Sequence, residues 1–276
     1  MRVALIYATW PVTPFGVTWY KLADSLREAG LGQALRASGH EVMEHVLVAE
    51  GPNALEFRGA FELGGQIARR CREAAVRGAF PVIICGSCAA GALGAIAGSS
   101  AARTGILWMD AHPDLNTPDT SGSGLLDGMA LAIALGKCWK LMGQDVAGLR
   151  PAFARDVCLF GARDIDPGEA LMLAVDDIPI VNTASDAVSR LAECSGVYIH
   201  LDMDVHDALQ VRTNNFAVPN GPSIEQVRAM LTETASRLPV AALSATGLDP
   251  AAPDAALAIG TAIDHIRAVC DNRKPA

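Results

Sequence analysis

Short runs of hydrophobic residues alternate with helical patterns along the whole chain. Runs such as Val82-Ile83-Ile84 and Ile106-Leu107-Trp108-Met109 are apolar at every position, so both faces of the strand that each predicts must be buried. Strands of this kind form a mostly parallel sheet that helices cover on each side, which predicts a three-layer α/β/α fold. The predicted strands span residues 2–8, 41–49, 81–85, 104–110, 156–161, 178–183, 196–204 and 239–246.

The composition provides enough apolar material for one extensive core. The 276 residues are 51% hydrophobic and 19% charged, and no low-complexity linker, repeat or shift of composition divides them. We therefore expect residues 1–276 to form a single domain. The net charge of −8, with no Lys/Arg block longer than two residues, argues against nucleic acid or a membrane as the main partner. A small soluble molecule fits better.

Cysteine usage and the first residues indicate a compartment. The seven cysteines are odd in number and scattered, which suits a reducing environment. The apolar run at residues 1–8 is too short for a signal peptide, and no run reaches membrane-spanning length. We expect a cytoplasmic protein, and the sequence leaves open whether it is a monomer or a homo-oligomer.

A first acidic cluster, Asp110-Ala111-His112-Pro113-Asp114, ends one predicted strand. In an extended chain the side chains of Asp110 and His112 project to the same side, because side chains repeat every two residues. Asp114 follows after the bend at Pro113. The cluster therefore predicts three metal ligands in one pocket.

A second acidic cluster ends another predicted strand, where Asp202 and Asp204 share one face and Asp207 follows. The loops at residues 113–126 and 205–223, rich in Gly, Pro, Asn and Ser, begin next to the two clusters. In open parallel sheets the ligand crevice lies at this carboxyl edge of the strands. Both clusters and both loops are thus expected to surround one site.

So many buried carboxylates require a cation. Each unpaired buried charge costs several kcal/mol or more, and a divalent metal is the natural neutraliser. Oxygen-rich ligation with one or two imidazoles favours Mn²⁺, Mg²⁺ or Fe²⁺, and several carboxylates can bridge two ions. A lone Asp-x-Asp is usually a turn or a cap, but two such clusters at the ends of apolar strands favour a metal site.

The two clusters, in this order, resemble the arginase/agmatinase (ureohydrolase) superfamily. Its Asp-Ala-His-x-Asp motif corresponds to residues 110–114 and its Asp-x-Asp-x-x-Asp motif to residues 202–207. The resemblance implies an arginase-like fold with a mainly parallel, eight-stranded sheet, and a metal-dependent hydrolase that acts on linear guanidino C–N bonds. It also implies two Mn²⁺ ions, bridged by Asp110 and Asp202. Their remaining ligands would be Cys88 and Asp114 at one ion, and His112 and Asp204 at the other.

Two further segments are similar to the parts of arginases that hold the amino-acid head of the substrate. They are residues 116–128, with Asn-Thr-Pro and Ser-Gly, and residues 163–169, with Arg-Asp-Ile-Asp-Pro-Gly-Glu. By this resemblance the α-carboxylate and α-amino group of a small amino-acid substrate would be held by Asn116, Ser123, Asp166 and Glu169. Asp-Pro-Gly-Glu is also a good helix start, and both interpretations can hold at once.

Three departures from the family lie at the guanidinium end of the expected site. Cys88 stands where the family has a metal-binding His, and as a soft donor for Mn²⁺ it would weaken that metal site. Asp127 replaces the loop His of arginases, and Gly247 stands in place of the Glu that holds the guanidinium. The amino-acid head contacts are kept, so the departures imply a substrate with an altered guanidino group.

This pattern resembles the Nω-hydroxy-L-arginine hydrolases of D-cycloserine biosynthesis, an antibiotic pathway, and implies that hydroxyurea and L-ornithine are the products. Asp114 would take the proton of the attacking hydroxide and pass it to the leaving ornithine nitrogen. Asp127 or His206 would assist at the hydroxylated nitrogen.

Three alternatives stay open. Arginase activity, or hydrolysis of another guanidino compound to urea, is the nearest. A different class is a thiol-redox protein that uses Cys85-Gly86-Ser87-Cys88 as a redox pair, although this leaves both carboxylate clusters unexplained. The third is a non-catalytic homologue that only binds ligands.

Overall fold

The structure is a computed structural model that describes residues 1–10, 18–50 and 57–274. Within these residues one sheet runs through the molecule, and it confirms the expected α/β class. Its strands are β1 (Arg2–Thr9), β2 (Glu41–Val48), β3 (Phe80–Cys85), β4 (Thr104–Met109), β5 (Val157–Phe160), β6 (Gly196–Asp202) and β7 (Val240–Thr246).

All paired strands are parallel, and their order across the sheet is β2-β1-β3-β7-β6-β4-β5. In the described part of the chain the sheet has seven strands instead of the expected eight. The predicted strand at residues 178–183 makes only one bridge, between Ile180 and Leu159. The strand predicted at residues 196–204 also ends early, at Asp202, because a 3₁₀ turn at Met203–Val205 follows it.

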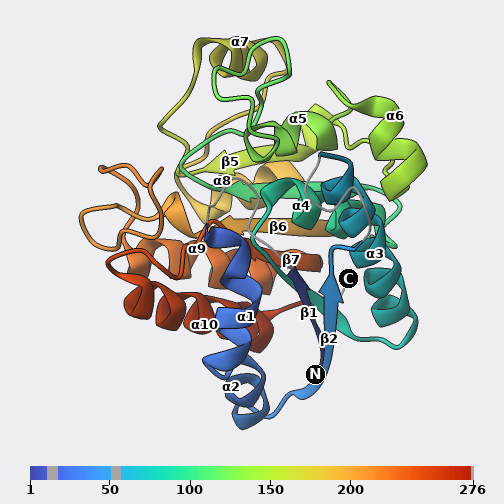
Figure 1. Ribbon diagram of the computed structural model, residues 1–276, viewed down its shortest axis with the longest axis vertical. Helices are drawn as coiled ribbons and strands as arrows, with labels where there is room; N and C mark the ends of the chain where they lie inside the picture. The colour runs from blue at the N-terminus through green and yellow to red at the C-terminus, as the bar shows by residue number, and fades with distance from the viewer. Residues whose placement is uncertain (11–17, 51–56, 275–276) are drawn as a thin grey trace.

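Helices cover both faces of the sheet, as Figure 1 shows. One face packs against α1 (Leu22–Glu28), α2 (Leu31–Ala37), α8 (Ala184–Leu191), α9 (Ile224–Arg237) and α10 (Ala255–Asn272). The other face packs against α3 (Phe57–Val76), α4 (Cys88–Ala97) and α5 (Ala130–Ala134). The short α6 (Lys140–Met142) packs on this second face, and α7 (Pro167–Val175) lies beyond the β5 side of the sheet. Two large apolar clusters, one on each face, form the core.

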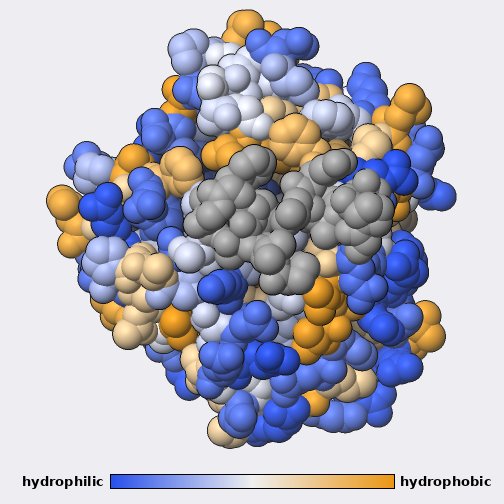
Figure 2. All heavy atoms as spheres, viewed as in Figure 1, coloured by the Kyte–Doolittle hydropathy of each residue, from blue (hydrophilic) through white to orange (hydrophobic). Residues whose placement is uncertain are grey.

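One face of the molecule is mainly polar. The face seen in Figure 2 carries mostly hydrophilic residues, with hydrophobic ones in small scattered groups. Within the described ranges, no helix combines the length and the apolar character that crossing a bilayer requires.

The topology places a crevice at the carboxyl edge of the sheet. The chain leaves β3, forms α4, and enters β4 three positions further along, so β7 and β6 lie between them. In open parallel sheets ligands bind at the carboxyl ends of neighbouring strands whose following helices lie on opposite faces, as α4 after β3 and α10 after β7 do. The carboxyl ends of β3, β7, β6 and β4 therefore converge on one region.

Candidate metal centre

A cavity of about 260 Å³ lies at this edge of the sheet. Every predicted site residue except His206 lines it: Cys88, Asp110, His112, Asp114, Asn116, Ser123, Asp127, Asp166, Glu169, Asp202 and Asp204. Both predicted loops contribute to the wall, and Trp19 and Phe216 form an aromatic pair on it, with ring centroids 5.7 Å apart. The structure thus brings together residues from four strand ends and two loops.

Asp110, His112 and Asp204 form one group of potential metal ligands. His112 Nδ1 lies 3.2 Å from Asp110 Oδ1 and 3.4 Å from Asp204 Oδ2. Burial alone would lower the pKa of His112, but the two carboxylates raise it well above its usual range. Without a metal ion, the protonated imidazole of His112 therefore balances the charge of the two carboxylates. A divalent ion that bound here would displace the His112 proton.

Asp202 and Cys88 face each other on the opposite side of the cavity. Cys88 Sγ lies 3.3 Å from Asp202 Oδ2, and the Thr246 hydroxyl donates to the same oxygen at 3.2 Å. The other Asp202 oxygen accepts the N–H of Asp204 at 2.9 Å, which caps the 3₁₀ turn after β6. Burial, and then the charge of Asp204, raise the pKa of Asp202 well above its usual value.

Asp114 provides the test of whether these residues fit a metal. Its side chain is 5% exposed, and its Oδ2 has no hydrogen-bond partner among the described residues. Burial, followed by the charge of Asp110, raises the pKa of Asp114 well above its usual value. An orphaned carboxylate oxygen beside three other buried carboxylates is the donor set that a divalent cation satisfies. The residues therefore fit a dinuclear metal site.

Asp127 holds the start of α4 in place. Its carboxylate accepts hydrogen bonds from Ser87 Oγ, from the Ala89 backbone N–H at 3.2 Å, and from the Tyr20 hydroxyl at 3.5 Å. These contacts flank Cys88, the first residue of α4. Burial raises the pKa of Asp127, so part of its population carries a proton at a higher pH than an exposed aspartate would.

The thiol-redox alternative finds no support here. Cys85 and Cys88 are free and buried. Burial raises the pKa of Cys85 to about 12, and burial together with Asp202 raises that of Cys88 well above its usual value. A redox pair needs a low-pKa thiolate, and neither side chain provides one.

The four residues predicted to hold the amino-acid head of the substrate differ in what they contact. Glu169 accepts the backbone N–H groups of Leu115 and Asp166, each at 3.0 Å, so both of its oxygens tie the loop to the start of α7. The helix-start interpretation of this segment is thereby confirmed. Asn116 Nδ2 donates to Asp166 Oδ2 at 2.9 Å, and Ser123 is exposed at the rim.

His206 is not brought to the cavity. It is fully buried, Nδ1 lies 2.8 Å from the Met203 carbonyl oxygen, and Nε2 lies 3.0 Å from Nε2 of His265. Both ring nitrogens are therefore occupied. The 3₁₀ turn after β6 directs this side chain into the core, so we withdraw His206 from the candidate catalytic residues.

The buried pair of His206 and His265 leads to a separate prediction about stability. Burial, and then His206, lower the pKa of His265 to about 3, against 6.5 for the unfolded chain. Below pH 6.5 the unfolded chain binds a proton that the folded chain binds only near pH 3, so stability is lost as the pH falls. The free energy of unfolding of the wild type should fall between pH 7 and pH 5. We expect this fall to be smaller in His265→Gln by about 2 kcal/mol, since each pH unit below 6.5 costs about 1.4 kcal/mol.

Urea unfolding of metal-free wild type and variant at both pH values measures this difference. Metal-ligand titration is common to both proteins and cancels. Equal losses for the two proteins would show that His265 is not the group responsible.

Two residues of the site were not predicted as part of it. Arg163 belongs to a motif that the sequence highlighted, yet its guanidinium lies within 3.2 Å of six backbone carbonyl oxygens, including those of Asp204 and His206. It fixes the loop after β6. His200 lies two residues before Asp202 on β6, and the two-residue period that linked Asp202 to Asp204 would have identified it.

Comparison with known proteins is consistent with this geometry. The arginase family model matches residues 23–262. The Nω-hydroxy-L-arginine amidinohydrolase of Streptomyces lavendulae is 36% identical over 128 residues, which cover 45% of this chain and 44% of that protein. The arginase of Bacillus subtilis is 32% identical over 139 residues, covering 45% and 46%. The chain thus matches less than half the length of these two relatives.

Solved structures show the same fold over the full chain. An arginase structure from Bacillus subtilis superposes with a TM-score of 0.87 at 20% identity, covering 97% of this chain and 98% of the other. The arginase of Bacillus caldovelox gives a TM-score of 0.85 at 21% identity, with 98% of both chains covered. At these identities the likeness establishes the fold.

Proposed function

The chain belongs to the arginase family, and on that premise we propose that it is a dinuclear metal-dependent amidinohydrolase that cleaves Nω-hydroxy-L-arginine to hydroxyurea and L-ornithine. The observation that carries the hydrolase proposal is the orphaned Asp114 oxygen among three other buried carboxylates in one cavity. The altered guanidinium end of the cavity supports the choice of substrate. We propose D-cycloserine biosynthesis as the pathway.

The proposed metal ligands are those that the cavity brings together. Asp110 and Asp202 would bridge two Mn²⁺ ions, Cys88 and Asp114 would hold one ion, and His112 and Asp204 the other. When bound, the ions would polarise the substrate and make a water molecule acidic enough to act as a nucleophile near neutral pH. The Ala111 backbone N–H and the Asn214 amide donate to Asp204, which orients its carboxylate.

Two carboxyl groups are proposed to move protons. Asp114 borders the cavity with one oxygen free of hydrogen bonds, so it can accept a proton at Oδ2 and release it to the departing ornithine nitrogen. Asp127 lines the same cavity, and its raised pKa suits a group that hydrogen-bonds the hydroxylated nitrogen. Its contacts with Ser87 and Ala89 fix its position.

The amino-acid head is proposed to lie at Asn116, Ser123 and Asp166. Asp166 is exposed on the cavity wall, and the Asn116 amide orients its carboxylate. Glu169 acts indirectly, because its oxygens already accept two backbone N–H groups. The amino-acid head would therefore contact the cavity wall, and Glu169 would hold that wall in position through its backbone hydrogen bonds.

The structure of the cavity at its guanidinium end supports Nω-hydroxy-L-arginine over arginine as the substrate. Gly247 has a φ of +65°, and a Cβ there would lie 1.7 Å from Asp202 Oδ1. The backbone thus leaves no room for the glutamate that arginine hydrolysis would use, by the family resemblance, to hold a charged guanidinium. An N-hydroxyguanidine is a weaker base, so it depends less on such a carboxylate.

A product assay tests the function. We expect Mn²⁺-loaded protein, given equal concentrations of Nω-hydroxy-L-arginine and L-arginine, to form hydroxyurea at least about tenfold faster than urea, since this ratio needs only about 1.4 kcal/mol of differential transition-state stabilisation. Mass spectrometry of ornithine, hydroxyurea and urea measures it. Predominant urea would indicate an arginase. No turnover of either substrate would refute the proposed activity.

A substrate without the α-amino group is the matched control for the head-group contacts. We expect a raised KM for this substrate, because Asp166 then loses its partner.

We also propose that residues 1–276 act as one domain in the cytoplasm. All seven cysteines are free thiols, which supports this location.

A further inference from the structure

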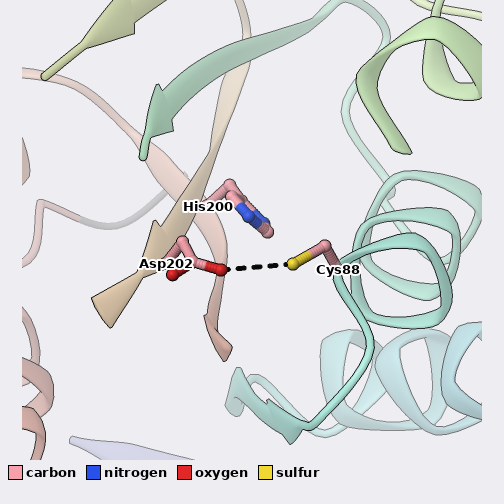
Figure 3. A group of neighbouring side chains, drawn as sticks. All are labelled: Cys88, His200 and Asp202. Carbon is pink, nitrogen blue, oxygen red and sulfur yellow. Dashed lines mark hydrogen bonds between the residues drawn. The ribbon is translucent and has the colours of Figure 1, made fainter. Parts of the chain in front are cut away.

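His200 lies on the same face of β6 as Asp202, which lines the cavity. The two side chains share that face because they are two residues apart on a strand. Figure 3 shows the imidazole of His200 and the thiol of Cys88, which begins α4, pointing toward the same space beside Asp202. Each of the three offers one potential ligand atom, and these atoms lie within 4.8 Å of one another.

The ring of His200 is held in a fixed orientation. It is fully buried and stacks on Trp108, with centroids 3.6 Å apart and an interplanar angle of 11°. Nδ1 lies 3.0 Å from the Tyr198 hydroxyl and 3.2 Å from the Ser244 hydroxyl. The opposite nitrogen, Nε2, consequently faces the carboxylates. A histidine that ligates a metal is oriented in this way, by polar contacts at its other ring nitrogen.

Nε2 itself makes only one long hydrogen bond in the described part of the chain, to the Thr246 hydroxyl. Its nearest polar neighbours are Thr246 Oγ1 at 3.4 Å and Asp110 Oδ2 at 3.8 Å, whereas a normal N–H···O bond spans about 2.7–3.2 Å. A histidine with a purely structural role would be expected to satisfy this nitrogen. The space between Nε2, Cys88 and Asp202 instead suits a cation.

We propose that His200 Nε2 binds the same metal ion as Cys88 and Asp202. This inference rests on the proposed function only in taking the cavity as a metal centre. The thiol of Cys88 gives its proton to solvent on binding. The ion on this side then has sulfur, nitrogen and oxygen donors, whereas the ion at Asp110, His112 and Asp204 has nitrogen and oxygen donors.

The two positions are therefore unequal in their choice of metal. A thiolate and an imidazole favour Zn²⁺ or Co²⁺ over Mn²⁺, while carboxylates with one imidazole suit Mn²⁺. The protein would bind Co²⁺ first on the Cys88 side. Bound Co²⁺ also reports on its ligands, because a thiolate gives a charge-transfer absorption in the near ultraviolet.

Co²⁺ titration of metal-free protein tests this ligand assignment. We expect wild type to bind two ions, one with the thiolate absorption. In His200→Gln the affinity of that ion should fall by at least about 100-fold, because loss of a ligand exceeds the 10–100-fold effect of its supporting contacts. His112→Asn is the matched control, and it should lose the other ion and keep the absorption. His200→Gln with both ions bound as tightly as in wild type would overturn the assignment.

A second measurement covers the case in which His200→Gln does not fold, since His200 is a core residue. The His112→Asn variant with one equivalent of Co²⁺ retains His200 as the imidazole nearest Cys88. X-ray absorption should then detect one sulfur and one imidazole at the same ion. Sulfur without imidazole would show that His200 is not a ligand.

These results separate this inference from the proposed activity. A protein that binds two ions through His200 but hydrolyses no guanidino compound would refute the proposed function and keep the metal site. If the protein is an active hydrolase and replacing His200 leaves the affinity of the thiolate-bound ion unchanged, the proposed ligand role of His200 is refuted and the proposed function stands.

Discussion

Asp110→Asn is expected to lower turnover by about 100- to 1000-fold, a loss of the size seen when one stabiliser of developing charge is removed, and to lower the bound metal to one ion per chain or fewer. Asp110 is a proposed bridge, so both ions lose a ligand. Its side chain is buried, with 2% of the residue exposed, and lies 3.2 Å from His112 and 3.8 Å from His200. Elemental analysis and the hydroxyurea assay measure the two effects.

Stability distinguishes loss of metal from loss of fold. Without metal, burial would raise the pKa of Asp110, but its contacts with His112 and His200 lower it below its usual range, so the folded protein favours the charged form. The metal-free variant should therefore be less stable than metal-free wild type at neutral pH, but it should still show a cooperative unfolding transition.

Asp156→Asn is the control for removing a buried carboxylate. Asp156 is 1% exposed and pairs with Arg103 at the start of β5, at the opposite edge of the sheet from the cavity. We expect this variant to lose stability and to keep its metal. An Asp110→Asn protein that retained both ions and full activity would rule out the dinuclear arrangement.

Gly247→Glu, which introduces the residue type that the family resemblance implies at this position, is expected to abolish metal binding instead of creating an arginase. A Cβ at this position would meet the Asp202 carboxylate at 1.7 Å, and φ is +65°. Either the backbone or Asp202 must move. Asp202 is a proposed bridging ligand, so its displacement removes a donor from both ions. Gly247→Ala should have the same defect, because the Cβ alone causes it.

The expected cost in stability combines two effects. A non-glycine residue in the left-handed region costs about 1–2 kcal/mol, and overpacking adds about 1–3 kcal/mol. Gly78→Ala separates them, because Gly78 has a φ of +64° with no described atom within 4 Å of its added Cβ. It should show the backbone cost alone and bind both ions. Urea unfolding and metal analysis of the two alanine variants give the comparison, and full metal content in Gly247→Ala would contradict the steric argument.

The strand pattern carried most of the information about the fold. Apolar runs such as that of β4 were identified because burial on both faces removes polar residues from every position. Residues 178–183 also contain Ile and Val but form only a single bridge, because Pro179 has no backbone N–H to donate to a neighbouring strand. Cys88 and Asp127 were found through resemblance, and their contact with the same helix start came from the structure.

By itself, the sequence determined the fold class and the two carboxylate clusters, because periodicity and charge are local properties that one strand or loop expresses alone. The tertiary structure decided which side chains share the cavity. It turned His206 toward His265, occupied both oxygens of Glu169 with backbone N–H groups, and placed His200 against Cys88 from a different element. These outcomes depend on turns after strand ends and on packing between distant segments, where a change of one dihedral angle moves a side chain between the site and the core.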